Sequence, residues 1–140
     1  MLFFIYICSN RVDILDYYLK WIRFILTNPR KKNGKCIVYY SKEKSCGKGE
    51  KGNMLRKVIG EDQSFMGNIK KLFGRFSNSG DTSLLSLYDE ISGNSFNNEN
   101  YNDFKNIITE VNGEREKKGI DIKKGCDFNK VILLTNEIGS

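Results

Sequence analysis

The sequence predicts an α/β fold with a parallel central sheet and crossover helices. Three short apolar segments rich in β-branched or large apolar residues have the pattern of buried strands: residues 36–40, 84–90 and 130–136. Segments with helical spacing separate them, which is the order of β-α-β units. In such sheets ligands collect at the carboxyl ends of the strands, so the polar groups found there are the first candidates for a site.

The other elements follow from spacing and turn residues. Residues 12–27 carry apolar side chains at helical spacing, and Pro29 marks the end of that helix. Residues 61–80 are mixed and suggest a short helix and a loop. Residues 92–102 are rich in Asn and Ser and predict a loop, and residues 101–108 have helical spacing. Residues 110–127 are charged and contain glycines, which favours a hairpin.

Length and composition limit the classes of protein. At 140 residues the chain is one domain or a piece of one, with enough length for a real core. We expect residues 1–28 to form a strand and helix that lead into a core over residues 29–140, incomplete at its C-terminus. The apolar start, residues 1–8, is too short to span a bilayer and lacks the basic flank of a signal peptide.

Charge and the missing residue types narrow the chemistry. The net charge is +6, and residues 30–57 hold ten Lys or Arg against two Glu, which suits a polyanionic partner or a solvated surface. The absence of histidine excludes Ser-His-Asp and other histidine-based catalysis. The four cysteines have no Cys-x-x-Cys spacing, so we do not expect a zinc site. Their small number and lack of pattern suit a protein of a reducing compartment.

The stretch over residues 36–59 has the order strand, Gly-Lys loop, helix. Gly47-Lys48-Gly49 closes the polar loop, and apolar residues at helical spacing follow. In this arrangement backbone N–H groups and a helix N-terminus face phosphates while a lysine adds a point charge. The sequence therefore predicts a phosphate-binding loop at the end of the first strand.

The other two strand ends supply complementary groups. Asp89 and Glu90 end the second strand, and Asn136 ends the third. Nucleotide hydrolysis needs a held phosphate, a Mg²⁺ ligand and an aligned water. We expect Lys48 at the phosphates, Asp89 in the Mg²⁺ shell, Glu90 polarising the water and Asn136 positioning it. Taken singly, the acid pair could instead be an ordinary helix N-terminal pair, and Asn136 a turn residue.

Several segments together resemble superfamily 3 helicases, the primase-helicase type of phages, plasmids and large DNA viruses. Cys46-Gly-Lys-Gly49 is similar to the Walker A loop of that family, and residues 84–90 to Walker B. Residues 72–76, 103–110 and 132–136 look like its segment before Walker B, its following helix and its sensor-1 strand. Glu116-Lys-Lys-Gly-Ile-Asp121 resembles motif B′, the most family-specific match.

The resemblance implies a three-layer P-loop NTPase of the AAA+-like type that binds ATP and Mg²⁺ and moves on single-stranded DNA as a hexameric ring. It places ATP on the loop formed by Ser45, Cys46, Gly47, Lys48, Gly49 and Glu50. It also gives the hairpin a role in gripping DNA, through Lys117, Lys118, Lys123 and Lys124. Such a protein would act in the cytoplasm or at viral or plasmid replication sites, without a membrane.

The sequence leaves a second function open. Lys42 stands where the first loop glycine is usual, and Gly49 where a Ser or Thr hydroxyl would reach Mg²⁺. The arginine finger expected downstream is not in these 140 residues, and such a finger contributes roughly 10³–10⁵ in rate in related NTPases. The alternative is an inactive or truncated P-loop remnant that binds nucleic acid or nucleotide without hydrolysis. Whether the chain is an enzyme is therefore open at this point.

Overall fold

The computed structural model describes residues 10–43, 45–73, 83–91, 95, 98–117, 120–126 and 128–136. For residues 98–99, 112–117 and 120–126 it describes the backbone alone. The chain divides into two compact units, residues 1–31 and 32–140, and each is described by itself.

In the first unit the structure describes the long helix α2 (Val12–Thr27), which confirms the helix expected there. Its buried residues recur every three or four positions and therefore share one face: Leu15, Tyr18, Trp21 and Ile25. On its solvent side the Lys20 ammonium lies 2.6 Å from the Asp16 carboxylate, an i,i+4 pair of the kind that stabilises exposed helices. No helix among the described residues is long and apolar enough to cross a membrane.

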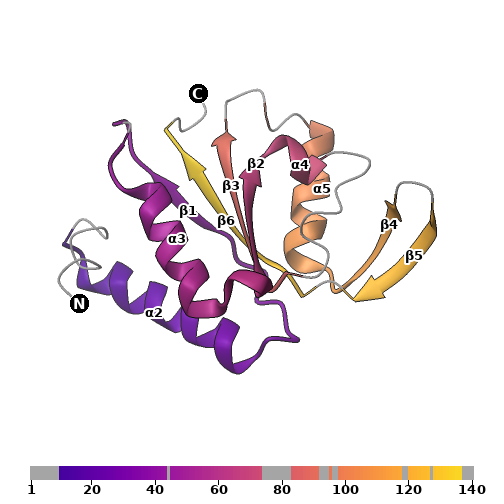
Figure 1. Cartoon of the computed structure of the whole chain (residues 1–140), viewed down its shortest axis with the longest axis horizontal. Helices are drawn as coiled ribbons and strands as arrows, with labels where there is room; N and C mark the ends of the chain where they lie inside the picture. Colours follow the sequence, from indigo (N-terminus) through magenta and orange to yellow (C-terminus); the bar gives the residue numbers. More distant parts are fainter. Residues whose placement is uncertain are drawn as a thin grey trace. The chain divides into compact units, whose positions relative to one another are not determined.

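The second unit is built on a four-stranded parallel sheet in the order β1-β6-β3-β2 (Figure 1). The last strand in the sequence, β6, lies between the first strand and β3, and β4 and β5 form a separate antiparallel pair. The elements in chain order are β1 (Ile37–Tyr40), α3 (Lys48–Ile59), the 3-10 turn η1 (Glu61–Gln63), β2 (Ser64–Asn68), α4 (Lys70–Phe73), β3 (Leu85–Ile91), α5 (Asn98–Thr109), β4 (Asn112–Lys117), β5 (Ile120–Cys126) and β6 (Lys130–Thr135).

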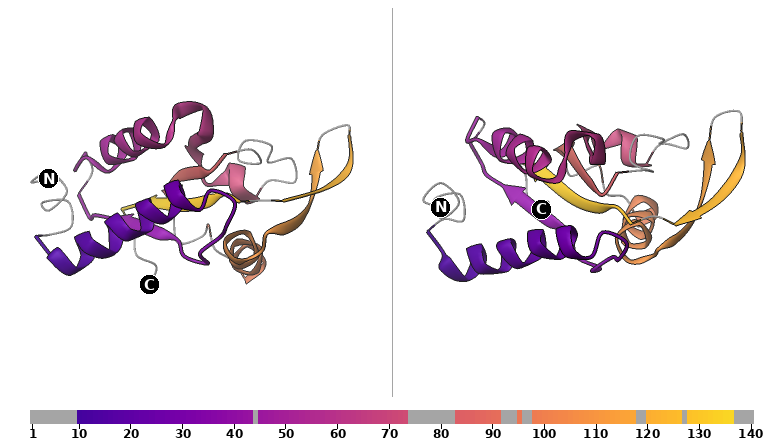
Figure 2. Two further views of the ribbon diagram at one scale, coloured as in Figure 1. Left: turned by 90° about the horizontal axis from the view of Figure 1, so that it is seen from below. Right: turned by 60° about the horizontal axis from the view of Figure 1, so that its bottom comes forward.

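Alternation along the strands gives the sheet two buried faces. Leu87 lies beside Ile132 on one face, and the backbone of Gly52 brings α3 directly against Leu87. Tyr88 lies beside Leu133 on the other face, in a cluster with Leu72 of α4 and with Phe104 and Ile107 of α5 packed against it. Figure 2 shows α3 and α5 on opposite sides of the sheet. The fold is thus the expected three-layer α/β fold of the P-loop type.

Two expectations about the elements were wrong. Residues 61–80 contain strand β2, and the expected short helix is the single turn α4. Strand β2 was not recognised because Ser64–Asn68 has no apolar run. It is an edge strand that pairs with β3 alone, so its sequence gives only a weak strand signal. Residues 98–100, expected to be loop, form the start of α5, so this helix begins before the segment 101–108 in which helical spacing was expected. Residues 1–9 and 74–82 lie outside the described parts, which leaves the segment at 74–76 untested.

Candidate functional site

The parallel strands place the predicted polar residues at one edge of the sheet. Strand β1 ends at Tyr40 and leads into the loop before α3, β3 ends shortly after Asp89 and Glu90, and β6 ends just before Asn136. Because these three strands are neighbours and run in the same direction, their carboxyl ends meet at the same edge. Residues from three distant parts of the chain therefore converge here.

Lys48 is the centre of this convergence. Its Nζ donates to Asn136 Oδ1 at 2.5 Å, across 88 positions in the sequence. The same ammonium lies 3.3 Å from the carbonyl oxygen of Ser41, 3.4 Å from that of Glu43 and 3.5 Å from Cys46 Sγ. All of these partners are formally neutral acceptors. An anionic phosphate would be a stronger partner for the ammonium than any of them.

The loop before α3 has the backbone geometry of an anion site. Gly47 is left-handed, with φ of 85°, and Lys48 begins the helix directly after it, so successive N–H groups turn toward one concavity. No side chain caps this helix end, and the N–H groups of its first turn have no partners within the helix. An added Cβ at Gly47 or Gly49 would meet no atom within 4 Å. The space directly beside these two glycines is therefore open.

The two acids lie in a β-bulge. Tyr88 is opposite Leu133 and Ile91 is opposite Thr135, so β3 carries one residue more than β6 between these pairs. Glu90 takes a left-handed backbone, with φ of 55°, which costs a non-glycine residue about 1–3 kcal/mol. Bulges and strained residues of this kind concentrate at functional sites, because they redirect a side chain that a regular strand would point elsewhere.

Asn68 is a site residue that the sequence did not indicate. Its Nδ2 donates to Glu90 Oε2, and its Oδ1 accepts from the backbone N–H of Lys70 at 2.8 Å. It ends β2 opposite Asp89, at the same edge as the other groups. The available signal was an asparagine at the end of a strand, but it was hidden because β2 itself was not recognised. The edge thus holds two polar pairs, Lys48 with Asn136 and Asn68 with Glu90.

The carboxylates at this edge decide whether Mg²⁺ with a nucleotide would fit the residues present. Among the described residues no three His, Cys, Asp or Glu side chains gather closely enough to hold a metal ion by themselves. Mg²⁺ is commonly held by one or two carboxylates together with substrate phosphates and water. Asp89 is partly exposed at the end of β3, and Glu50 is exposed on the first turn of α3. A metal site here would need the nucleotide to complete it.

Two cysteines of the second unit, one before β1 and one in the loop that follows it, have opposite thiol properties. A hydrogen bond with the Ser41 side chain, assisted by Lys48, lowers the pKa of the exposed Cys46 thiol. Burial raises the pKa of Cys36 to about 12. Since the thiolate is the reactive form, Cys46 is the reactive member of the pair.

The expected hairpin is present as β4 and β5, and Figure 1 shows it as a ribbon separate from the central sheet. Lys117 lies at the end of β4, while Lys123 and Lys124 are opposite Arg115 and Glu114 in the ladder. The side chains of these lysines, and all of Lys118, lie outside the described parts.

Comparisons with known proteins agree with this fold. The sequence model of the family of unknown function DUF5906 matches residues 39–140. The apo structures of the C-terminal region of NrS-1 superpose with TM-scores of 0.80, 0.74 and 0.74 at 18%, 16% and 17% identity. They cover 94–96% of this chain, which spans only 30–32% of theirs. No curated protein matches the sequence significantly.

Proposed function

We propose that this chain, which belongs to the family of unknown function DUF5906, is the ATP-binding core of a DNA helicase of a viral, phage or plasmid replication protein. The proposal rests on the site, because the family description gives no activity. The observation that carries the proposal is the bond between Lys48 and Asn136 beside an uncapped helix N-terminus. A lysine, a left-handed glycine and the tip of a neighbouring strand together form a phosphate-binding arrangement.

The proposed roles are assigned from the chemistry of each side chain and are supported by its position at the edge of the sheet. Lys48 exchanges its neutral partners for phosphate oxygens, and the N–H groups from Gly47 onward bind the same oxygens. Asp89 supplies a carboxylate ligand for Mg²⁺, which neutralises phosphate charge when it is bound. Glu90 accepts a hydrogen bond from the attacking water once Asn68 releases it, and Asn136 positions that water. In this proposal Asn68 controls when the Glu90 carboxylate is available.

Single-stranded DNA is the proposed partner of the β4–β5 hairpin. Lysines near a hairpin tip neutralise backbone phosphates without reading sequence, and the affinity then falls with salt. Replacing Lys117, Lys118, Lys123 and Lys124 with alanine should flatten the salt dependence of single-strand binding. An unchanged slope would remove the hairpin from the site. The hexameric ring belongs to the same proposal, because it comes from the resemblance to superfamily 3 helicases.

A second function has its own supporting observations. Gly49 offers no hydroxyl to Mg²⁺, and the Glu90 carboxylate is bonded to Asn68 rather than to Lys48 or Asn136 among the described residues. A protein with these features could bind nucleotide without hydrolysing it.

Calorimetric titration with ATP and Mg²⁺, followed by a phosphate-release assay with single-stranded DNA, separates the two functions. Nucleotide binding that Lys48→Ala abolishes, with release that Glu90→Gln abolishes, supports the helicase core. Binding without release supports the second function. Failure of the unmodified protein to bind at millimolar ATP refutes both nucleotide roles.

A further inference from the structure

Helix α2 carries a line of exposed apolar side chains along its length. Val12, Leu19 and Leu26 are 70%, 44% and 52% exposed, and each lies seven residues after the one before. Seven residues are almost two turns of an α-helix, so these side chains lie one above the other over about 21 Å. Single exposed apolar residues are ordinary on a protein surface, but a continuous line of them is a candidate contact surface.

The spacing is that of a helix that packs against another helix. Leu15 is buried and Ile22 is partly exposed, and both lie beside the exposed line. With them, the apolar residues fall at positions 12, 15, 19, 22 and 26, which is the a and d pattern of a coiled-coil seam. The exposed line occupies the a positions of this seam. The occupant that fits it is therefore a second helix with apolar side chains at the same spacing.

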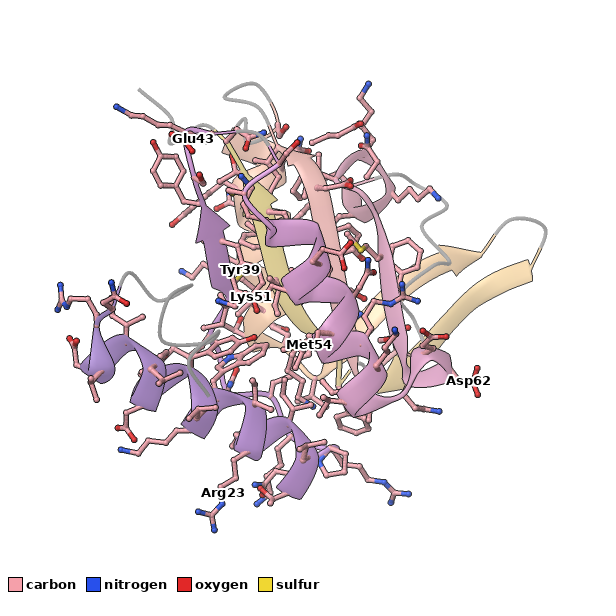
Figure 3. All side chains as sticks on the ribbon, turned by 60° about the vertical axis from the view of Figure 1, so that its left-hand side comes forward. Arg23, Tyr39, Glu43, Lys51, Met54 and Asp62 are labelled. Atoms are coloured by element: carbon pink, nitrogen blue, oxygen red, sulfur yellow. The ribbon has the colours of Figure 1, made fainter. Side chains whose placement is uncertain are left out.

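The charges beside the line point to a second copy of α2 in the antiparallel direction. Asp16 and Arg23 lie on one flank of the line, at equivalent positions of successive heptads, and both are exposed. Among the described residues Arg23 has no ion-pair partner, and Figure 3 shows its side chain extending outward from α2. A two-fold axis close to Leu19 would set Asp16 of each copy beside Arg23 of the other, because the two residues lie at similar distances on either side of it.

A parallel pair of helices would not use these charges. It would set Asp16 and Arg23 against the other flank of the second helix, where Tyr18 and Ile25 stand at the equivalent positions. Asp16 also pairs with Lys20 of its own helix at 2.6 Å, and a carboxylate can accept a second donor. Lys20 lies farther round the helix from the line than Asp16 does. The charges therefore favour the antiparallel pair.

We propose that α2 is a self-association surface, on which two copies of this chain pair antiparallel along Val12, Leu19 and Leu26, with Asp16 and Arg23 forming ion pairs across the contact. The contact is isologous, so it is separate from the head-to-tail contacts that would build a ring. It goes beyond the proposed function and does not depend on the phosphate site. The seam is only two heptads long, so we expect a weak pair, with a dissociation constant on the order of tens of micromolar.

Sedimentation equilibrium of the whole chain, over concentrations that bracket this value, tests the surface. Leu19→Gln should remove the dimer without lowering the melting temperature, because the side chain is half exposed in the single copy. Tyr17→Gln is the matched control, since Tyr17 is 49% exposed on the opposite side of the same helix and should leave the dimer intact. Equal effects of the two variants, or a larger assembly that Leu19→Gln leaves unchanged, overturn the inference. A monomer at every concentration also overturns it and gives the line a different occupant.

Exchange of the two charges tests the direction of the pair. Asp16→Arg and Arg23→Asp should each weaken self-association about tenfold, because two attractive contacts become repulsive. An equimolar mixture of the two variants should associate about as well as the unmodified protein, since each charge then meets its opposite. Lys20→Glu is the control, because it breaks the pair with Asp16 inside the helix and should not weaken association. If mixing does not restore association, or if Lys20→Glu weakens it equally, the antiparallel pair is wrong.

Discussion

The contact between α3 and the sheet allows a quantitative test, because two glycines of that helix differ in one respect. An added Cβ at Gly52 would lie 2.6 Å from Leu87 Cδ2, whereas one at Gly49 would meet nothing within 4 Å. Alanine at either position gains about 1 kcal/mol of helix propensity. That gain cancels when the two variants are compared, so the difference between them isolates the packing of α3 on β3.

The size of the difference follows from the clash. Ordinary contact begins at 3.4 Å, so Leu87 or the helix must move by about 0.8 Å. Leu87 is fully buried and cannot rotate into solvent, and overpacking of such a site costs about 1–3 kcal/mol. For a chain of this length, 1 kcal/mol corresponds to roughly 3–5 °C in melting temperature. Gly52→Ala should therefore melt roughly 3–15 °C below Gly49→Ala.

The assay is thermal unfolding of both variants followed by circular dichroism, with urea unfolding as a second measurement of the free energy. Equal melting temperatures would show that α3 does not lie this close to β3, and the placement of the loop before α3 would lose its support. If Gly49→Ala folds normally and Gly52→Ala weakens nucleotide binding, the loop before α3 depends on the packing of that helix against β3.

The remaining predictions concern the two cysteines and Asn68. Cys46 should react with iodoacetamide near neutral pH well before Cys36, because the pKa of Cys46 is lowered while that of Cys36 is raised to about 12. Peptide mapping by mass spectrometry measures the two modification rates, and ATP should slow the modification of Cys46. Faster modification of Cys36 than of Cys46 would contradict the geometry. Asn68→Ala should lower the free energy of unfolding by about 1 kcal/mol, since the N–H of Lys70 loses its acceptor. Asn68→Asp keeps that acceptor but sets a second carboxylate beside Glu90, and the repulsion raises the pKa of the pair in the folded state. The loss of stability in this variant should therefore shrink as the pH falls from 7 toward 4. A loss that does not depend on pH would show that the two side chains do not meet.

The strongly patterned parts of this fold could be predicted from the sequence. The helix Val12–Thr27 and strand β6 (Lys130–Thr135) agree with their expected ranges to within one residue, because a long periodic pattern and a continuous apolar run are clear signals. Strand β2 was missed because an edge strand with polar ends and a glycine has neither signal. The hairpin was foreseen from its glycines and charges.

The site could be predicted only as a set of strand ends. That Lys48 and Asn136 would meet follows from the parallel order of the strands, once β6 is placed beside β1. The bulge at Asp89 and Glu90 could not be foreseen, because it depends on the register between β3 and β6.

Binding of ATP with Mg²⁺ to the unmodified protein and to Lys48→Ala, measured side by side by calorimetry, tests the central claim most directly. The phosphate-site account predicts saturable binding by the unmodified protein and none by Lys48→Ala at the same concentrations, with both proteins folded. Equal binding by the two, or none by the unmodified protein at millimolar ATP, would contradict it.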